Sequence, residues 1–165
     1  MAEEHHPRTL KDLSHLSEAE AAREMAKEAR REKKVDSVRI RYLAYDESRL
    51  DEAEVADIRA CFPFRDSPGV SWVNVDGIHD VELIRELGEH FGWHPLLLED
   101  IVSTGQRAKE EEYGDHLYVV LPMLTWDAER AQVVHEQLSL VLGAGYVFTF
   151  QERVGDVFEA VRERL

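Results

Sequence analysis

Two neighbouring carboxylates, Glu99 and Asp100, close the segment H-P-L-L-L-E-D-I at residues 94–101. Carboxylate oxygens are the ligands that Mg²⁺ and Ca²⁺ prefer, and Mg²⁺ is typically held by one or two carboxylates while it keeps several waters. Two carboxylates supply only half of such a site, so a neighbouring surface would have to complete it. The competing interpretation is that both are ordinary solvated charges.

The element that positions these carboxylates is predicted to be a short helix over residues 95–103. Pro95 suits the first helical position, because its missing N–H would have no partner there in any case. At 100° per residue, the two carboxylates fall in one sector and the apolar side chains in another. The sequence therefore predicts that Glu99 and Asp100 point away from a core formed by Leu97, Leu98, Ile101 and Val102.

For the other residues that could bind a metal or act as nucleophiles, the sequence favours structural roles. His90 and His94 are four apart, but Gly92 and Pro95 interrupt any helix that would present both to zinc, so packing at helix ends is expected. Cys61 lies among apolar neighbours and is expected to be a buried, inert thiol. The chain contains no dinucleotide-binding glycine motif, phosphate loop or serine nucleophile motif. No complete enzymatic site can be assembled, and we expect no catalysis.

Charge is distributed unevenly along the 165 residues. Residues 1–50 carry 11 basic and 11 acidic side chains, whereas residues 51–165 carry nine basic and 23 acidic ones, so this second part holds the whole net charge of −14. Such a field attracts cations and repels phosphate backbones, which argues against nucleic-acid binding. A single cysteine, no signal peptide and no apolar run of about 20 residues predict a soluble, cytosolic chain of one domain.

Hydrophobic periodicity predicts an α/β domain over residues 37–165. Alternation indicates an edge-like strand near 38–42, and helical spacing indicates helices over 51–62, 80–91 and 156–165, the last with Val157, Phe158 and Val161 inward. Further strands are expected at 70–75, 116–124, 132–142 and 146–151, the last three as antiparallel hairpins. Glu110–Glu112 is expected on a solvated loop. Helices interleaved with strands predict layers around a mixed sheet.

The sequence predicts a different structure for each end of the chain. Residues 1–36 are predicted to form an extension, with a disordered start and a charged helix that begins at the Ser17 capping box. The last helix reaches Leu165 without a Gly or Pro stop signal, so the chain is expected to continue in a longer protein.

Seven fragments in order resemble the cytoplasmic N-terminal domain of the CorA family of magnesium and cobalt transporters. The similarity covers residues 70–165 and, more loosely, residues 37–69. One fragment, Q-R-A-K, departs from the family pattern by having Ala108 in place of proline. The fragments are V-S-W-V-N-V-D-G (70–77), F-G-W-H-P-L-L-L-E-D-I (91–101), Q-R-A-K (106–109), E-E-Y-G-D-H-L-Y-V-V-L (111–121), E-Q-L-S-L-V-L (136–142), F-T-F-Q-E (148–152) and G-D-V-F-E-A-V-R-E-R-L (155–165).

This resemblance implies a three-layer α/β/α sandwich around a mixed, largely antiparallel sheet. It also implies a homopentameric transporter whose stalk and membrane helices and Gly-Met-Asn pore motif are absent from this chain. The domain would lie on the cytoplasmic side of the inner membrane and meet the membrane only through that missing region. Its partners would be identical subunits, their stalk helices and divalent cations.

The family's Glu-Asp pair matches Glu99 and Asp100. The resemblance therefore implies that they help form a regulatory magnesium site between subunits, which could also bind cobalt or other divalent cations. Loss of the ion would let facing acidic surfaces repel, so intracellular magnesium would restrain its own uptake. Three alternatives remain: the domain of a zinc-exporting relative, a free-standing metal-dependent enzyme, and a scaffold whose acidic face only keeps the subunits soluble.

Overall fold

The computed structural model of the chain describes residues 37–128 and 131–165, and the predicted extension over residues 1–36 lies outside them. Within the described part, seven strands form one sheet in the order β2-β1-β3-β7-β6-β5-β4. Every neighbouring pair is antiparallel except β3 and β7, which run parallel. The mixed, largely antiparallel sheet of an α/β domain is therefore confirmed. The strands are β1 (Arg39–Tyr45), β2 (Leu50–Val55), β3 (Val70–Asp76), β4 (Lys109–Tyr113), β5 (His116–Asp127), β6 (Gln132–Gly143) and β7 (Tyr146–Gln151).

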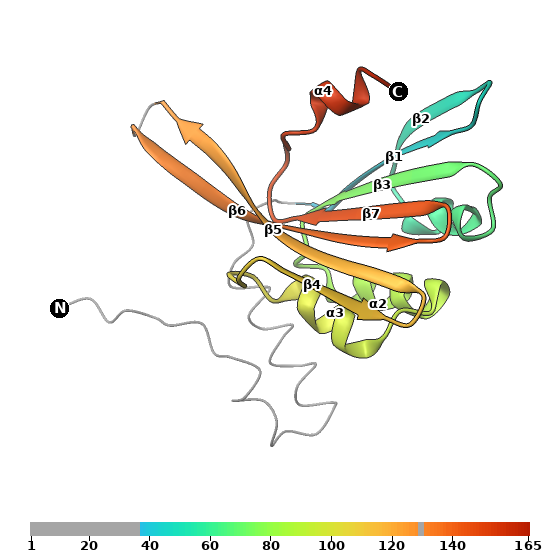
Figure 1. The fold of residues 1–165 in the computed structure, drawn as a ribbon, viewed down its shortest axis with the longest axis horizontal. Helices are drawn as coiled ribbons and strands as arrows, with labels where there is room; N and C mark the ends of the chain where they lie inside the picture. Colours follow the sequence, from blue (N-terminus) through green and yellow to red (C-terminus); the bar gives the residue numbers. More distant parts are fainter. Residues whose placement is uncertain (1–36, 129–130) are drawn as a thin grey trace.

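The helices are unequally divided between the two faces of this sheet (Figure 1). The 3₁₀ helix η2 (Ile58–Arg65) and the helices α2 (Val81–Phe91) and α3 (Pro95–Val102) pack near one another on one side. The other side carries α4 (Glu159–Arg162), a single turn. A full second helical layer is not formed by the residues that the structure describes, so the three-layer arrangement stays a prediction.

Helix α2 supplies much of the core between the helices and the sheet. Asp80 caps it by accepting a hydrogen bond from the backbone N–H of Leu83, and Gly92 ends it in the left-handed conformation, with φ of 73°. Its apolar face is buried at Ile84, Leu87 and Phe91, as the spacing predicts. Aromatic rings from α2, β7 and the α2–α3 connection then form one cluster: Phe91, Trp93, Tyr146, Phe148 and Phe150.

The predicted helix over residues 51–62 is wrong in its first half. Residues Leu50–Val55 form strand β2 instead, which pairs with β1 so that β1 lies inside the sheet and not at its edge. Arg39 on β1 holds Glu54 on β2, with Nε and Oε2 2.7 Å apart. The apolar spacing could not reveal that β1 offers an unpaired row of backbone donors and acceptors, which a short polar strand can satisfy. Helical structure begins only at Ile58.

The predicted last helix is also shorter, and its predicted inward face is wrong for Val157 and Val161. Val157 and Val161 are exposed, at 57% and 47%, whereas Arg162 is buried. The Arg162 guanidinium lies over the Trp72 ring, 4.7 Å from its centroid, and pairs with Asp156. Phe158 meets the same ring edge-on at 5.6 Å. Because a flat guanidinium can stack on an aromatic ring while pairing with a carboxylate, arginine takes the position that apolar periodicity assigned to valine.

Replacing Gly143 by alanine tests the packing where β6 meets β7. A methyl group there would overlap the Tyr146 ring, which cannot easily move because it lies against Phe91, and its hydroxyl is 2.8 Å from Nε2 of His116. We expect Gly143→Ala to lower the free energy of unfolding by about 1–3 kcal/mol in urea denaturation. The exposed neighbouring substitution Ala144→Ser should change it by less than about 0.5 kcal/mol. A Gly143→Ala chain as stable as the parent would contradict this packing.

Candidate functional site

Helix α3 forms as its sequence predicts. Pro95 occupies its first turn, and Nδ1 of His94 caps the helix by accepting a hydrogen bond from the Leu96 N–H at 3.2 Å. Leu97 and Ile101 are fully buried beneath it. The helix is therefore fixed to the core by its apolar face, and this sets the directions of Glu99 and Asp100.

Asp100 does not point to solvent, which corrects the prediction from helical angles. Its side chain is only 5% exposed, and its Oδ2 accepts hydrogen bonds from Nζ of Lys109 at 2.7 Å and from the Tyr113 hydroxyl at 3.3 Å. Both donors come from strand β4. A helical wheel gives the angle of a side chain but not what lies opposite it, and here the neighbouring strand carries polar groups. Asp100 is thus a buried, ion-paired carboxylate.

Strand β4 extends this contact into a network, so Glu111 belongs to a strand and not to a loop. Oε2 of Glu111 accepts hydrogen bonds from Tyr113 at 2.8 Å and from Lys109 at 3.0 Å. These bonds hold the pKa of Glu111 below its ordinary value. Burial lowers the pKa of Lys109, but its hydrogen bonds to Asp100 and Glu111 outweigh burial and leave that pKa raised. Lys109 is therefore a stable ammonium shared by two carboxylates.

The loop between α3 and β4 is fastened by two glutamines. Nε2 of Gln106 donates to the backbone carbonyls of Asp100 at 2.7 Å and Ser103 at 2.8 Å, so it closes the end of α3. Gln137 on β6 accepts from the Gln106 N–H at 2.9 Å and donates to the Ser103 carbonyl at the same distance. Gln106 and Lys109 both belong to the Q-R-A-K fragment, whose first and last residues thus hold Asp100 from two sides.

Two acceptor groups at this site have no donor. The half-buried Glu99 carboxylate makes no hydrogen bond or ion pair with the described residues, and burial together with the charge of Asp100 raises its pKa. Oδ1 of Asp100 is shielded from solvent and likewise has no hydrogen-bond partner. Carboxylate oxygens that accept no hydrogen bond are suitable ligands for a hard divalent cation such as Mg²⁺.

These oxygens do not make a complete metal site by themselves. No group of three or more His, Cys, Asp or Glu side chains is arranged to hold a metal ion within residues 37–128 and 131–165. The two histidines have packing roles, as predicted: His90 stacks on Phe62 at 3.8 Å, and His94 caps α3. Cys61 is fully buried, which raises the pKa of its thiol to about 12. Any metal held by Glu99 and Asp100 needs further ligands from outside the described residues.

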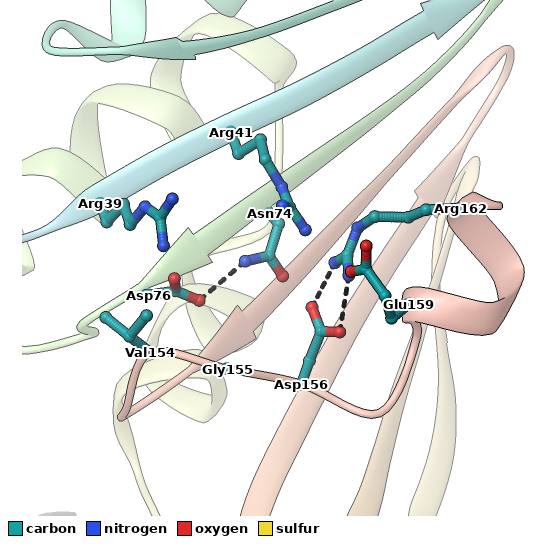
Figure 2. A pocket seen from close by; sticks show the side chains of 9 residues that line it. All are labelled: Arg39, Arg41, Asn74, Asp76, Val154, Gly155, Asp156, Glu159 and Arg162. Atoms are coloured by element: carbon teal, nitrogen blue, oxygen red, sulfur yellow. Dashed lines mark hydrogen bonds and ion pairs between the residues drawn. The ribbon is translucent and has the colours of Figure 1, made fainter.

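A second polar site, which the sequence analysis missed, lies on the opposite face of the sheet (Figure 2). Asn74 and Gln151 both donate to Oδ1 of Asp76 at 2.7 Å, and burial raises the pKa of that carboxyl group. Polar residues at alternate positions of the two parallel strands were the available signal. The pocket has a volume of about 150 Å³ and is lined by Arg39, Arg41, Asn74, Asp76, Val154, Gly155, Asp156, Glu159 and Arg162.

The charges around this pocket balance one another, and the principal ones are already paired. Figure 2 shows Arg162 and Asp156 face to face, with Nη1 of Arg162 2.8 Å from Oδ1 of Asp156. Arg39 is held by Glu54. Since the Arg162 pair also lies against Trp72 of β3, the cluster fastens residues 153–165 to the sheet. Its evident role is structural.

Comparison with known proteins identifies the family to which this chain belongs. Residues 67–165 match the family model described as "CorA-like Mg2+ transporter protein", which is more than half of the chain. The chain belongs to the CorA family. Among the described residues, no helix has both the length and the apolar character needed to cross a membrane.

Three individual proteins illustrate the relationship. The chain is 40% identical over 126 residues to the cobalt/magnesium transport protein CorA of Thermotoga maritima, a match that spans 76% of this chain and 36% of that protein. Its fold is similar to that of the ZntB cytoplasmic domain from Vibrio parahaemolyticus, with a TM-score of 0.56, 9% identity and coverage of 77% of this chain and 49% of the other. It is also similar to full-length CmaX, with a TM-score of 0.55, 14% identity and coverage of 79% and 39%.

Replacing Lys109 by an uncharged residue tests how much the burial of the Asp100 charge destabilises the fold without its cation. We expect Lys109→Met to lower the free energy of unfolding at neutral pH by about 2–4 kcal/mol, because it leaves a buried charge without its cation. The double variant with Asp100→Asn should recover most of this loss, as measured in urea. Arg107→Met, an exposed substitution two residues away, is the matched control and should be nearly neutral. If Lys109→Met and Arg107→Met lowered the free energy of unfolding equally, the buried ion pair would be contradicted.

The charged Glu99 carboxylate should weaken the fold at neutral pH. Its pKa is raised in the folded state, so the folded chain binds this proton more tightly than the unfolded chain does. The cost of its charge is full above the folded pKa and absent below the unfolded value of 4.5. We expect Glu99→Gln to raise the melting temperature at pH 7 by about 1–3 °C.

The pH dependence provides the control for this prediction. The difference in melting temperature between Glu99→Gln and the parent should vanish as the pH falls through the Glu99 pKa, which NMR titration of its side-chain carboxyl carbon would locate. A gain in stability that persists at acidic pH would show that charge is not its cause.

Proposed function

We propose that this chain is the cytoplasmic regulatory part of a CorA-type divalent-cation transporter, in which Glu99 and Asp100 contribute carboxylates to a magnesium-sensing site between subunits. The observation that carries the proposal is the pair of donorless acceptors: the Glu99 carboxylate and the buried Oδ1 of Asp100. A protein that only needed surface charge would gain nothing from desolvating these groups. Membership in the CorA family supports the choice of ion class.

The site is proposed to be completed by a neighbouring subunit. Mg²⁺ binds six oxygens and keeps several waters, so carboxylates from a stalk helix of an adjacent subunit would supply what Glu99 and Asp100 lack. The assembly we propose is a homopentamer on the cytoplasmic side of the membrane. The chain spans only 36% of its Thermotoga relative, which leaves room for stalk and membrane helices in such a transporter.

The regulatory mechanism follows from charge. Residues 51–165 carry 23 acidic and nine basic side chains, so facing subunits repel unless cations lie between them. Two unit charges 4 Å apart interact by about 4 kcal/mol at an effective dielectric constant of about 20. Bound Mg²⁺ would bridge the subunits and favour the closed ring, and its loss would let the ring loosen. Magnesium inside the cell would then limit its own entry, and the domain needs no catalytic group.

Zinc transport is the second candidate function, because the fold is similar to that of the ZntB cytoplasmic domain. The donor set favours magnesium over zinc at the sensing site. Zn²⁺ sites in proteins are commonly built from cysteine and histidine, whereas the acceptors at the end of α3 are carboxylate oxygens. His94 is the nearest imidazole along the chain, and its Nδ1 is occupied in capping α3. Cobalt and other divalent cations would share the carboxylates with magnesium.

The test is ion uptake by the complete transporter carrying this domain. We expect Glu99→Gln combined with Asp100→Asn to relieve the inhibition of uptake by intracellular Mg²⁺, measured as an inhibition midpoint at least several-fold higher. Glu110→Gln combined with Glu112→Gln, which removes two exposed charges from the neighbouring strand β4, is the matched control and should leave the midpoint nearly unchanged. Unaltered Mg²⁺ inhibition in the double variant would rule out these carboxylates as the sensor.

A further inference from the structure

We propose that Lys109 is a resident cation that occupies the Asp100 carboxylate in the absence of metal and is displaced when a divalent cation binds. The inference rests on the proposed function, because it concerns how the same site is regulated. Lys109 would set the metal concentration at which the site responds, since each binding event requires the ammonium to leave.

Lys109 already fills the coordination position of a cation. Its Nζ lies 2.7 Å from Oδ2 of Asp100 and 3.0 Å from Oε2 of Glu111, so one ammonium bridges two carboxylates from a helix and a strand. The Tyr113 hydroxyl also contacts both acceptors, at 3.3 and 2.8 Å. Because Asp100 is almost completely buried, the Lys109 ammonium is needed to offset the cost of removing its negative charge from water.

Lys109 opposes the binding of a metal ion at Asp100 while its ammonium group stays in place. Oδ2 is engaged, and Oδ1 is shielded from solvent although it has no partner. A divalent cation within bonding distance of this carboxylate would also lie a few ångströms from a positive charge. Metal binding and the Lys109–Asp100 ion pair are therefore mutually exclusive or strongly opposed.

Lys109 is a member of the network that can move. Asp100 is held by helix α3, whose end is closed by Gln106, and the backbone of β4, which carries Lys109, Glu111 and Tyr113, is held by its pairing with β5. The Lys109 side chain is 26% exposed, so its flexible stem can carry the ammonium into water. Glu99, half-buried and without a donor, is the carboxylate on which an arriving ion would first settle.

Tethering makes this competition effective. An ammonium attached to the same chain acts at a high local concentration, which lowers the apparent affinity of the carboxylates for metal without altering the ligands themselves. A site that must ignore small amounts of divalent cation and respond to the larger amounts present in a cell benefits from such a competitor. Arg107, two residues earlier, is exposed and has no contact with Asp100, so it does not share this role.

The reactivity of the Lys109 amine tests the exchange without any substitution. Lys109 is the one lysine of residues 37–128 and 131–165, and mass spectrometry of peptides can follow its trace acetylation separately from the other four lysines of the chain. In the complete transporter that carries this domain, we expect slow acetylation of Lys109 in NaCl and several-fold faster acetylation in saturating MgCl₂ of equal ionic strength. In Asp100→Asn, Lys109 should react quickly with or without Mg²⁺.

Metal titration of matched variants of the complete transporter gives a second measure. NMR of the Glu99 and Asp100 carboxyl carbons during a MgCl₂ titration should show that Lys109→Gln raises the affinity by roughly tenfold. Arg107→Gln removes the same charge nearby and should have a much smaller effect.

The outcomes separate this inference from the proposed function. Lys109 reactivity that ignores Mg²⁺, together with carboxyl signals that respond to it, would overturn the exchange and leave the sensing site intact. Equal gains in affinity from the two charge-removing variants would overturn it as well, since only a general electrostatic effect would remain. Carboxyl signals of the complete transporter that never respond to Mg²⁺ would also overturn it, while the uptake experiment judges the proposed function independently.

Discussion

A carboxylate taken out of water must keep a donor or a cation beside it, and this constraint organises both faces of the sheet. On the helical face, the ion pair between Asp100 and Lys109 ties the end of α3 to strand β4. On the other face, the pair between Asp156 and Arg162 ties the C-terminal residues to Trp72. Apolar burial brings these surfaces together, and the two buried pairs add a specific polar contact on each face.

Local signals in the sequence were sufficient for much of the fold. Helix α2 carries its own start and stop residues, Asp80 and Gly92, and strands β5 to β7 are rich in Val, Leu, Tyr and Phe and lie close together in the sequence. Such information lies within a few residues of each element, so it can be read without knowing what lies across from it. Strand β2 was missed because its stability comes from its partner β1, which supplies hydrogen bonds that no local pattern records.

The same distinction separates what could be predicted of the site from what could not. Glu99 and Asp100 were identified from their residue type and from a family resemblance, and the helix that carries them was correctly placed. The burial of Asp100 could not be predicted, since it depends on Lys109 and Tyr113 arriving from strand β4. The burial of Arg162 also depends on a residue that is distant in the sequence. Trp72 beneath it explains why this charged residue is buried while Val161 is exposed.

The single parallel pairing in this sheet, β3 with β7, has a consequence for the order in which the domain forms. On one side of it lie β2, β1 and β3, and on the other lie β7, β6, β5 and β4, each set joined by connections within its own stretch of chain. Contacts across the junction join residues 75 positions apart, such as Asn74 with Thr149. Closing so long a loop costs entropy before any contact repays it. Each half can therefore pair its strands locally, and the domain becomes one cooperative unit only when the two halves meet along this seam.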